Sequence, residues 1–379
     1  LKEVLGRNDL GTLNGSFNGE ATIAGKRSKA HLDGSVTDFS FRGHNYSILS
    51  TNIDYKGGAI DGKLALLDDA GKINLDFDGE TTPGKKFFNL SAKIENVDLY
   101  GLNLTDKYEG YLLNANIDAN LKGLLPDRAD GVVTISNPSL TSSDGNSLAF
   151  NNITIISNAS ALPRSLQLKS DVINGDITGD FSFSSLLPTI SDIALQALPT
   201  LTDTKAVKEI RKKADFGGND FNFSFTLDNL DNISDFFNLP INAIYPIDIE
   251  GNFDATNSQA SLILDAPYLR QGNKLIEGTQ LSIAVDGNEG FDRVALNTSY
   301  PSRDGGMIAM TLALQANNNI VDTDINWKID RKRDYSGSVA MSTLIDNNDG
   351  NINSYTDIHQ STITFNDSSW IVSPALIVT

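Results

Sequence analysis

The sequence predicts a mainly β protein of antiparallel strands that each have one apolar face, interrupted near the middle of the chain by a short helical insertion. Most of the 379 residues alternate between apolar and polar side chains, which is the period of a half-buried strand. Turn sequences such as SSDGN (142–146) and NNDGN (347–351) separate these segments and predict hairpins. The interval 186–214 departs from this period.

The strand-like segments extend through most of the chain. Their polar positions hold Asn, Asp, Ser, Thr and Lys, which is typical of antiparallel sheets with one solvated face. The apolar positions of the clearest segments are, in order, Leu13-Phe17-Ala21-Ile23, Ile73-Leu75-Phe77, Leu113-Ala115-Ile117-Ala119-Leu121, Ile177-Phe181-Phe183, Phe221-Phe223-Phe225-Leu227, Ile247-Ile249-Phe253, Ile308-Met310-Leu312-Leu314 and Ile325-Trp327-Ile329.

Residues 186–214 are predicted to form two short helices. The apolar residues from Ile190 to Leu198 recur at helical spacing, and Pro199 ends that pattern. Asp203 is a suitable N-cap for a second, basic helix, which we interpret as a solvated face, with docking to an anionic lipid or a partner as the alternative. The predicted organisation is therefore β repeats over 1–185, a helical insertion over 186–214, and continuous β repeats over 215–379.

A repeated unit is visible in the parity of the apolar positions. Four segments begin with apolar residues on one parity, switch to the other, and end in a Gly- or Asn-containing turn. A bulge or kink at the switch would keep all the apolar residues on one face. Proline at two of the switches predicts a break in the strand pairing there. The four segments are 30–45, 90–103, 133–146 and 262–273.

Composition excludes several classes of function. The formal net charge of −18 disfavours nucleic acid as a partner, because the phosphates would be repelled. The chain has no cysteine, and His31, His44 and His359 show no metal-ligand spacing. The Asn- and Asp-rich segment 345–357 fails as a calcium loop, since an isoleucine occupies its first position. We therefore expect no enzymatic activity, no metal and no cofactor.

The one-faced strands have two possible arrangements. Two sheets could stack about 10 Å apart, or one long sheet could curl into a trough whose apolar lining accepts a ligand. Acyl chains would suit such a lining, because the hydrophobic effect needs no particular geometry. The alternation alone leaves both arrangements open.

Three stretches of the chain resemble the TamB family of translocation and assembly module proteins and, more broadly, AsmA-like repeating-β-groove proteins. The likeness covers nearly the whole chain. It consists of the general pattern of the residues and the order of the repeated units, and it includes no catalytic motif. The stretches are DLGTLNGSFNGEATIAG (9–25), LDNLDNISDFFNLPINAIYPIDIEGNFDATNSQASLILDAPYLRQGNKL (227–275) and STITFNDSSWIVSPALIV (361–378).

The resemblance implies an elongated, curled antiparallel β-sheet groove, shaped like a taco, in the periplasm of a Gram-negative bacterium. Such a groove would conduct phospholipid acyl chains between the inner and outer membranes and support outer-membrane protein assembly. An inner-membrane anchor and the contact with an Omp85-type outer-membrane barrel partner (TamA-like) would lie outside this segment. We interpret the sequence as a piece of a longer protein.

Under this hypothesis a set of inward residues lines the groove. Two alternatives remain, a surface β-protein that binds glycans or acts as an adhesin, and a polysaccharide-processing β-solenoid, which lacks a regular coil period here. The predicted lining residues are Phe181, Phe183, Phe221, Phe223, Phe225, Leu227, Ile249, Phe253, Met310, Leu312 and Trp327.

Overall fold

The predicted fold class is confirmed by a computed structural model. Its described residues are mainly strands, which pair antiparallel in an open, curled sheet. The predicted helices of the insertion lie outside the described residues, except for isolated positions such as Thr189 and Thr200. The structure describes residues 10–123, 126–182, 185, 188–189, 200, 219–287, 291–302, 306–329, 335–348 and 351–378.

The chain forms two compact units. Unit 1 holds Leu1–Ala161 and Leu166–Asp171, and unit 2 holds Leu162–Ser165 and Val172–Thr379. The division therefore falls before the boundary at 186–214 that the sequence suggested. The reason is visible in the pairing, because the strands on either side of that insertion, 173–180 and 220–227, are hydrogen-bonded neighbours within unit 2.

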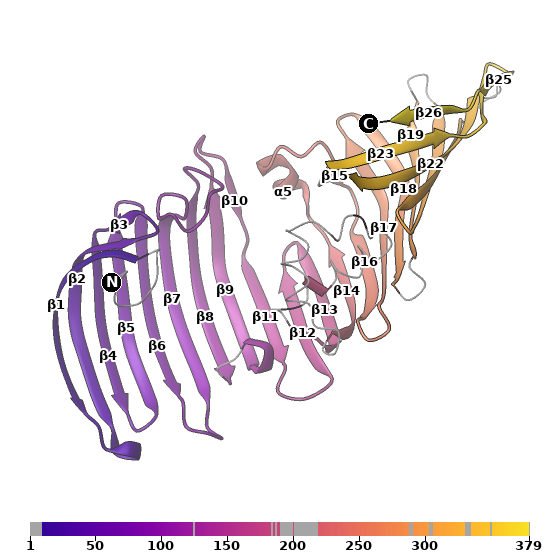
Figure 1. Ribbon diagram of the computed structural model, residues 1–379. Helices are drawn as coiled ribbons and strands as arrows, with labels where there is room; N and C mark the ends of the chain where they lie inside the picture. Colours follow the sequence, from indigo (N-terminus) through magenta and orange to yellow (C-terminus); the bar gives the residue numbers. More distant parts are fainter. Residues whose placement is uncertain are drawn as a thin grey trace. The chain divides into compact units, whose positions relative to one another are not determined.

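Unit 1 is an antiparallel meander in which successive strands lie side by side in chain order (Figure 1). Two short 3-10 helices, η1 (Gly25–Arg27) and η2 (Pro126–Arg128), lie in its connections. Its strands are β1 (Leu10–Thr22), β2 (Lys29–Phe41), β3 (His44–Tyr46), β4 (Ile48–Lys56), β5 (Ala59–Asp68), β6 (Gly71–Glu80), β7 (Phe87–Asp98), β8 (Leu112–Lys122), β9 (Asp130–Thr141), β10 (Ser147–Ala149) and β11 (Asn152–Asn158), and β12 (Arg164–Ser170) is shared between the units.

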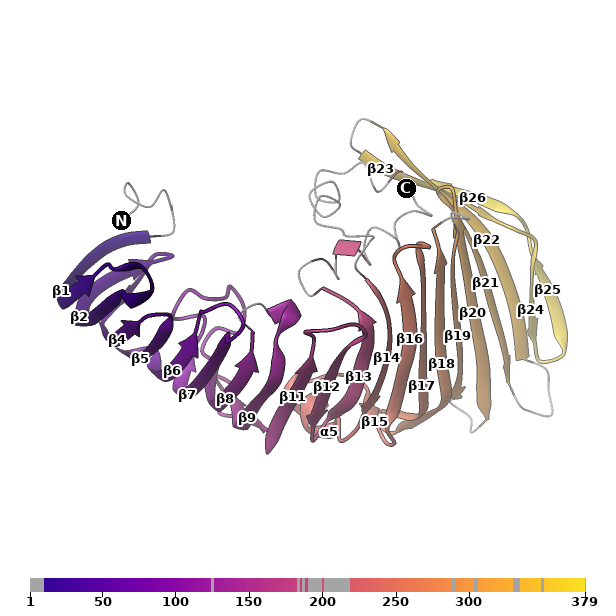
Figure 2. The ribbon, with the colours of Figure 1, turned by 90° about the horizontal axis from the view of Figure 1, so that it is seen from below.

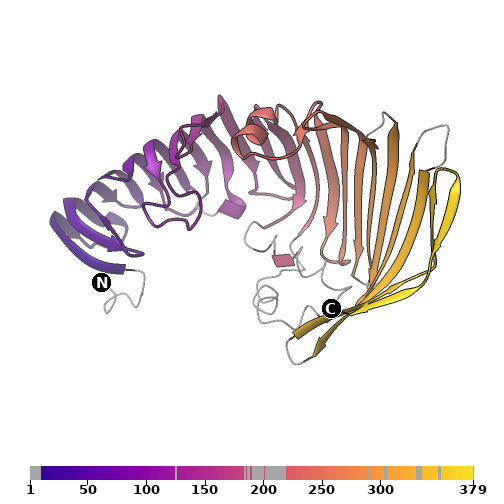
Figure 3. The same cartoon turned by 90° about the horizontal axis from the view of Figure 1, so that it is seen from above.

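Unit 2 continues the same antiparallel pattern in a curled sheet (Figure 2). One short helix that the sequence analysis missed, α5 (Asp231–Phe236), lies at one end of its strands and contacts β15 (Figure 3). The strands are β13 (Ile173–Asp180), β14 (Asp220–Leu227), β15 (Asn242–Ala243), β16 (Ile247–Asp254), β17 (Gln259–Gln271), β18 (Lys274–Asp286), β19 (Phe291–Pro301), β20 (Met307–Asn317), β21 (Ile320–Ile329), β22 (Tyr335–Asn348), β23 (Asn351–Ile358), β24 (Ser361–Phe365), β25 (Ser368–Val372) and β26 (Ala375–Val378).

The predicted bulges occur at the parity switches. In the first three repeats the pairing shifts by one residue, between β1 and β2, β7 and β8, and β8 and β9. Asn96 and Asn137 absorb two of these shifts with φ of 51° and 50°, in the left-handed region that asparagine tolerates. In the fourth repeat Pro267 has no paired partner, and the shift lies on the neighbouring strand β18 beside Gly278.

A small core closes one corner of unit 1. Val97 and Leu102 are fully buried there with Tyr46, whose hydroxyl donates to the Leu102 carbonyl over 2.9 Å. Nearby, the Asp68 carboxylate accepts hydrogen bonds from the Ser47 and Ala70 amides. The Tyr46 bond holds the loop after β7 against this buried cluster, and the Asp68 bonds join the connection between β3 and β4 to the turn after β5.

Away from that corner the sheet is a single layer. Among the described elements, every substantial contact joins strands that are paired or flank one another in the sheet, apart from α5 against β15. Two stacked sheets would instead bring sequence-distant strands face to face. Within each unit the described residues therefore form a one-layer sheet and not a sandwich. None of the described helices is long and apolar enough to cross a membrane.

Candidate functional site

The apolar face of unit 2 is organised as ladders of directly paired side chains. Paired residues in an antiparallel sheet place their side chains on the same face. One ladder crosses eight strands from β14 to β22, and all its members are partly buried. They are Phe225, Ile249, Leu264, Leu281, Leu296, Leu312, Ile325 and Val339.

Neighbouring ladders run beside this one. The next begins with Ile177 and Phe223 and crosses to Met341, and its members without a large apolar side chain are Gly251 and Thr323. On the other side Met310 and Trp327 are paired. The described apolar lining is therefore a band at least three residues wide, since the strands place every second residue on this face.

Most of the predicted lining residues are brought together by these ladders. Phe225, Ile249 and Leu312 share the first ladder, Phe223 lies on the second, and Leu227 pairs with Ile247 on the same face. Met310 is 39% exposed, which makes it an accessible member of the lining. Phe183 lies outside the described residues.

Three of the predicted lining residues are buried instead of presenting surface. Phe181, Phe221 and Phe253 are only 2–4% exposed. The Phe181 ring meets Phe221 edge-on at 6.2 Å, and Phe221 stacks on Phe253 at 5.5 Å between centroids. These rings form an aromatic core at one end of the ladders, so a ligand on the face would not contact them. Their burial depends on neighbours distant in sequence, which alternation cannot reveal.

Buried polar groups adjoin this aromatic core. Asn219 is 1% exposed, and its amide donates to the Ser185 hydroxyl at 3.0 Å while its carbonyl oxygen accepts from the Ser182 amide at 3.1 Å. The Asn219 main-chain carbonyl also accepts from the Ala255 amide. Through its side chain and main chain, Asn219 therefore links the segment after β13, the start of β14 and the end of β16.

The lining aromatics lie against glycines of neighbouring strands. A Cβ built on Gly251 would come within 2.6 Å of the Phe223 ring, and one on Gly34 would come equally close to Phe17. Each aromatic is paired directly with its glycine, so the ring occupies the space that a side chain would take. The described pairs are Phe17 with Gly34, Phe77 with Gly62, Phe223 with Gly251, Phe225 with Gly175, and Trp327 with Gly337.

Several lining residues were missed at the sequence level. Trp370 is 66% exposed and continues the row of Trp327 and Gly337 through its partner Ile363. Leu264, Leu281 and Leu296 complete the first ladder. Alternation places each of them on one side of its own strand, but only the register between strands shows that they form one continuous row.

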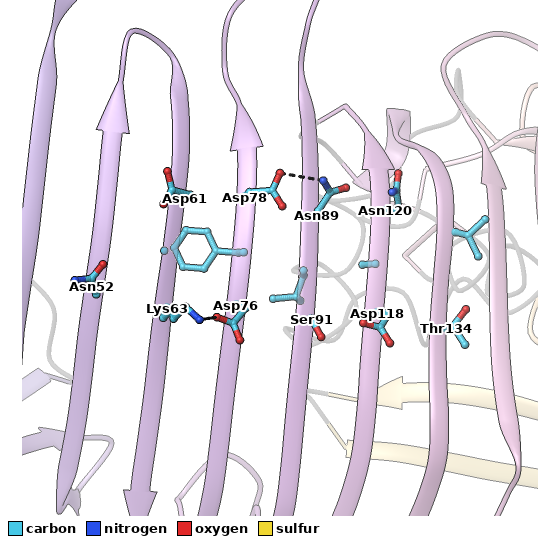
Figure 4. A pocket seen from close by; sticks show the side chains of 15 residues that line it. Asn52, Asp61, Lys63, Asp76, Asp78, Asn89, Ser91, Asp118, Asn120 and Thr134 are labelled. Atoms are coloured by element: carbon cyan, nitrogen blue, oxygen red, sulfur yellow. Dashed lines mark hydrogen bonds and ion pairs between the residues drawn. The ribbon is translucent and has the colours of Figure 1, made fainter.

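The opposite, polar face of unit 1 contains a hollow of about 550 Å³ (Figure 4). Asp76 pairs with Lys63 at 2.9 Å, and Asp78 accepts from the Asn89 amide at 3.0 Å. The Lys63 and Asp76 side chains are more than half exposed, so this ion pair contributes little to stability. Among the described residues no group of three or more acidic, His or Cys side chains could hold a metal ion.

The three histidines have separate hydrogen-bond partners. His44 contacts Asp68 at 3.1 Å and His31 contacts Asp54 at 2.9 Å. Burial alone would raise the pKa of Asp68, but hydrogen bonds from the Ala70 and Ser47 amides and from His44 hold it below its ordinary value.

His359 differs because it contacts a hydroxyl, that of Ser342, at 3.1 Å. Ser342 also donates to the Asp322 carboxylate at 2.5 Å. In a nucleophilic triad the carboxylate would instead orient the histidine. This contact therefore does not have the arrangement that activates a serine.

The fold and the ladders define the protein as a single-layer antiparallel β protein with an extended apolar face. Comparisons with protein-family models, curated proteins and solved structures found no match to this chain.

Proposed function

We propose that this chain is a non-enzymatic groove segment that binds acyl chains along its apolar face and conducts phospholipids between two membranes. The observation that carries the proposal is the continuous apolar ladder, which no other described element covers. Soluble monomers rarely leave a contiguous apolar surface of more than a few hundred Å² without a ligand or partner.

The dimensions of the ladder suit an acyl chain. Eight strands spaced about 4.8 Å apart give a track of roughly 34 Å. One leaflet of a bilayer has a hydrocarbon thickness of about 15 Å, half of the usual 30 Å core. The described ladder is thus about twice as long as one acyl chain, so a lipid can occupy several positions along it.

The chemistry of the ladder favours movement along it. Each buried methylene gains about 0.8 kcal/mol wherever it lies on an apolar surface. The central rungs are Leu264, Leu281, Leu296 and Leu312, which are chemically identical, so a chain displaced by one rung loses and regains similar contacts. No directional bond to this row has to break during such a step.

The cellular setting follows from the resemblance of the sequence to TamB proteins. We propose that the segment acts in the periplasm of a Gram-negative bacterium, between inner and outer membranes, and supports outer-membrane biogenesis. An Omp85-type outer-membrane protein would be the partner of regions outside this segment. The position of Trp370 in the lining row supports lipid conduction over glycan binding, because a carbohydrate platform would be expected at turns.

Site-specific photo-crosslinking in cells tests the proposal. A benzophenone amino acid replaces Met310 on the apolar face, and the matched control replaces Thr311, which is exposed on the opposite face of the same strand. We expect phospholipid adducts from position 310 and none above background from position 311. Equal labelling at both positions, or no lipid adduct at either, would contradict the proposal.

A further inference from the structure

One carboxylate interrupts the apolar face of unit 2. Asp292 on β19 pairs with Val285 on β18 and Ala316 on β20, so its side chain lies on the lining face. The same row continues to Val321 on β21. All the remaining members of this row from β16 to β21 are apolar. Asp292 is therefore an exception to the pattern of the lining.

Among the residues that the structure describes, the surroundings of Asp292 provide no countercharge. On the two strands packed against β19, the nearest residues of the same face are Ile283 and Val285 on β18 and Leu314 and Ala316 on β20. None of them titrates or carries a charge. Burial among these groups raises the pKa of Asp292 to about 6, since the charged form loses hydration without gaining a partner.

The residue also lies near the edge of the apolar face. β19 begins at Phe291, one residue before Asp292, and its neighbours β18 and β20 end at Asp286 and Asn317. The carboxylate is therefore close to the ends of these strands, where Asn317 and Asn318 are exposed. A phospholipid whose acyl chains follow the ladders would place its headgroup at such an edge, because its charged groups must remain hydrated.

We propose that Asp292 is a headgroup-binding residue that selects phospholipids carrying a primary ammonium group. This inference rests on the function proposed above and names the class of lipid. An ammonium group would supply the missing countercharge and donate charge-assisted hydrogen bonds to the carboxylate. A chain with a formal net charge of −18 disfavours anionic headgroups, which would also be repelled by Asp292 itself.

Lipid competition on the purified chain tests the assignment. Wild type, Asp292→Asn and the control Asp324→Asn are incubated at pH 7.5 with vesicles containing equal amounts of phosphatidylethanolamine and phosphatidylglycerol, and bound lipid is quantified by mass spectrometry. Asp324 is exposed on the opposite face of β21, so its substitution removes the same charge without touching the lining. The asparagine at 292 keeps the shape of the side chain.

We expect wild type and Asp324→Asn to enrich phosphatidylethanolamine over phosphatidylglycerol. In Asp292→Asn this enrichment should be about tenfold smaller, while the total amount of bound lipid stays the same. At pH 5 the wild-type preference should fall towards that of Asp292→Asn, whose own preference should not change with pH. An unchanged lipid ratio in Asp292→Asn overturns the headgroup assignment alone. Absence of both lipids from the wild type overturns the proposed function and this inference together.

Discussion

Replacing Asp292 by asparagine should stabilise the folded protein at neutral pH. Burial raises the pKa of this carboxyl from 3.8 to about 6. Because a tenfold change in a proton-binding constant corresponds to about 1.4 kcal/mol, the difference between a pKa of 3.8 and one of about 6 corresponds to ~3 kcal/mol. Because the side chain is partly exposed, solvent screens part of this cost, and we expect a gain of about 1–2 kcal/mol in the free energy of unfolding at pH 7.5.

The direction of the pH dependence follows from proton binding. Between pH 3.8 and about 6 the folded protein holds the Asp292 proton more tightly than the unfolded chain does, so stability falls as pH rises through this window. Above it the carboxylate is charged in both states and its desolvation cost is fully present. Below it both states are protonated, and the advantage of the asparagine variant should disappear.

Urea unfolding followed by tryptophan fluorescence measures this difference. The chain has two tryptophans, and Trp327 lies on β21, two strands from β19. Wild type, Asp292→Asn and the polar-face control Asp324→Asn are compared at pH 7.5 and pH 4. A variant that is no more stable than wild type at pH 7.5, or that keeps the same gain at pH 4, would refute the reasoning.

Three further predictions concern stability. Gly251→Ala should cost about 1–3 kcal/mol, because the added Cβ would overlap both the Ser261 carbonyl oxygen and the Phe223 ring. A double-mutant cycle with Phe223→Ala should show coupling of at least 0.5 kcal/mol for the ring's part of this cost, and strict additivity in denaturant unfolding would exclude a contribution from the ring. Asp68→Asn should lower the free energy of unfolding by about 1.5–3 kcal/mol above pH 3.8, because the lowered pKa of this carboxyl stabilises the fold there. The difference between variant and wild type should shrink as pH falls below 3.8, and a difference that does not depend on pH would contradict the assignment. Asn219→Ala should lower the midpoint of thermal unfolding through a loss of about 1–3 kcal/mol, and an unchanged midpoint would show that its buried hydrogen bonds are dispensable.

Much of the fold could be predicted from the sequence, because the alternation of apolar and polar residues is visible within each strand by itself. Alternation identified the strand around Phe223, and the change of parity near Asn96 and Asn137 identified two bulges. The helix α5 was missed, since its six residues are too few to show a helical period.

The ladders could not be predicted in the same way. They depend on which residue of one strand faces which residue of the next, and that register is a tertiary property. Alternation could have placed Asp292 on the same face as Val294 and Leu296, and this was the available signal for the exception in the lining. The described neighbours of Asp292 that lack a charge belong to β18 and β20, which only the structure brings together.

The aromatic and glycine pairs have a consequence for how the chain reaches its native pairing. Strands with similar alternation can slide by two residues and still keep their apolar side chains on the correct face, so alternation alone leaves the register open to such errors. A slip of two residues would move the Trp327 ring away from Gly337 and onto Val339 or Tyr335. Each pair therefore favours one alignment of two neighbouring strands, because the ring fits only beside its glycine. A few such pairs protect a meander of many similar strands against misalignment.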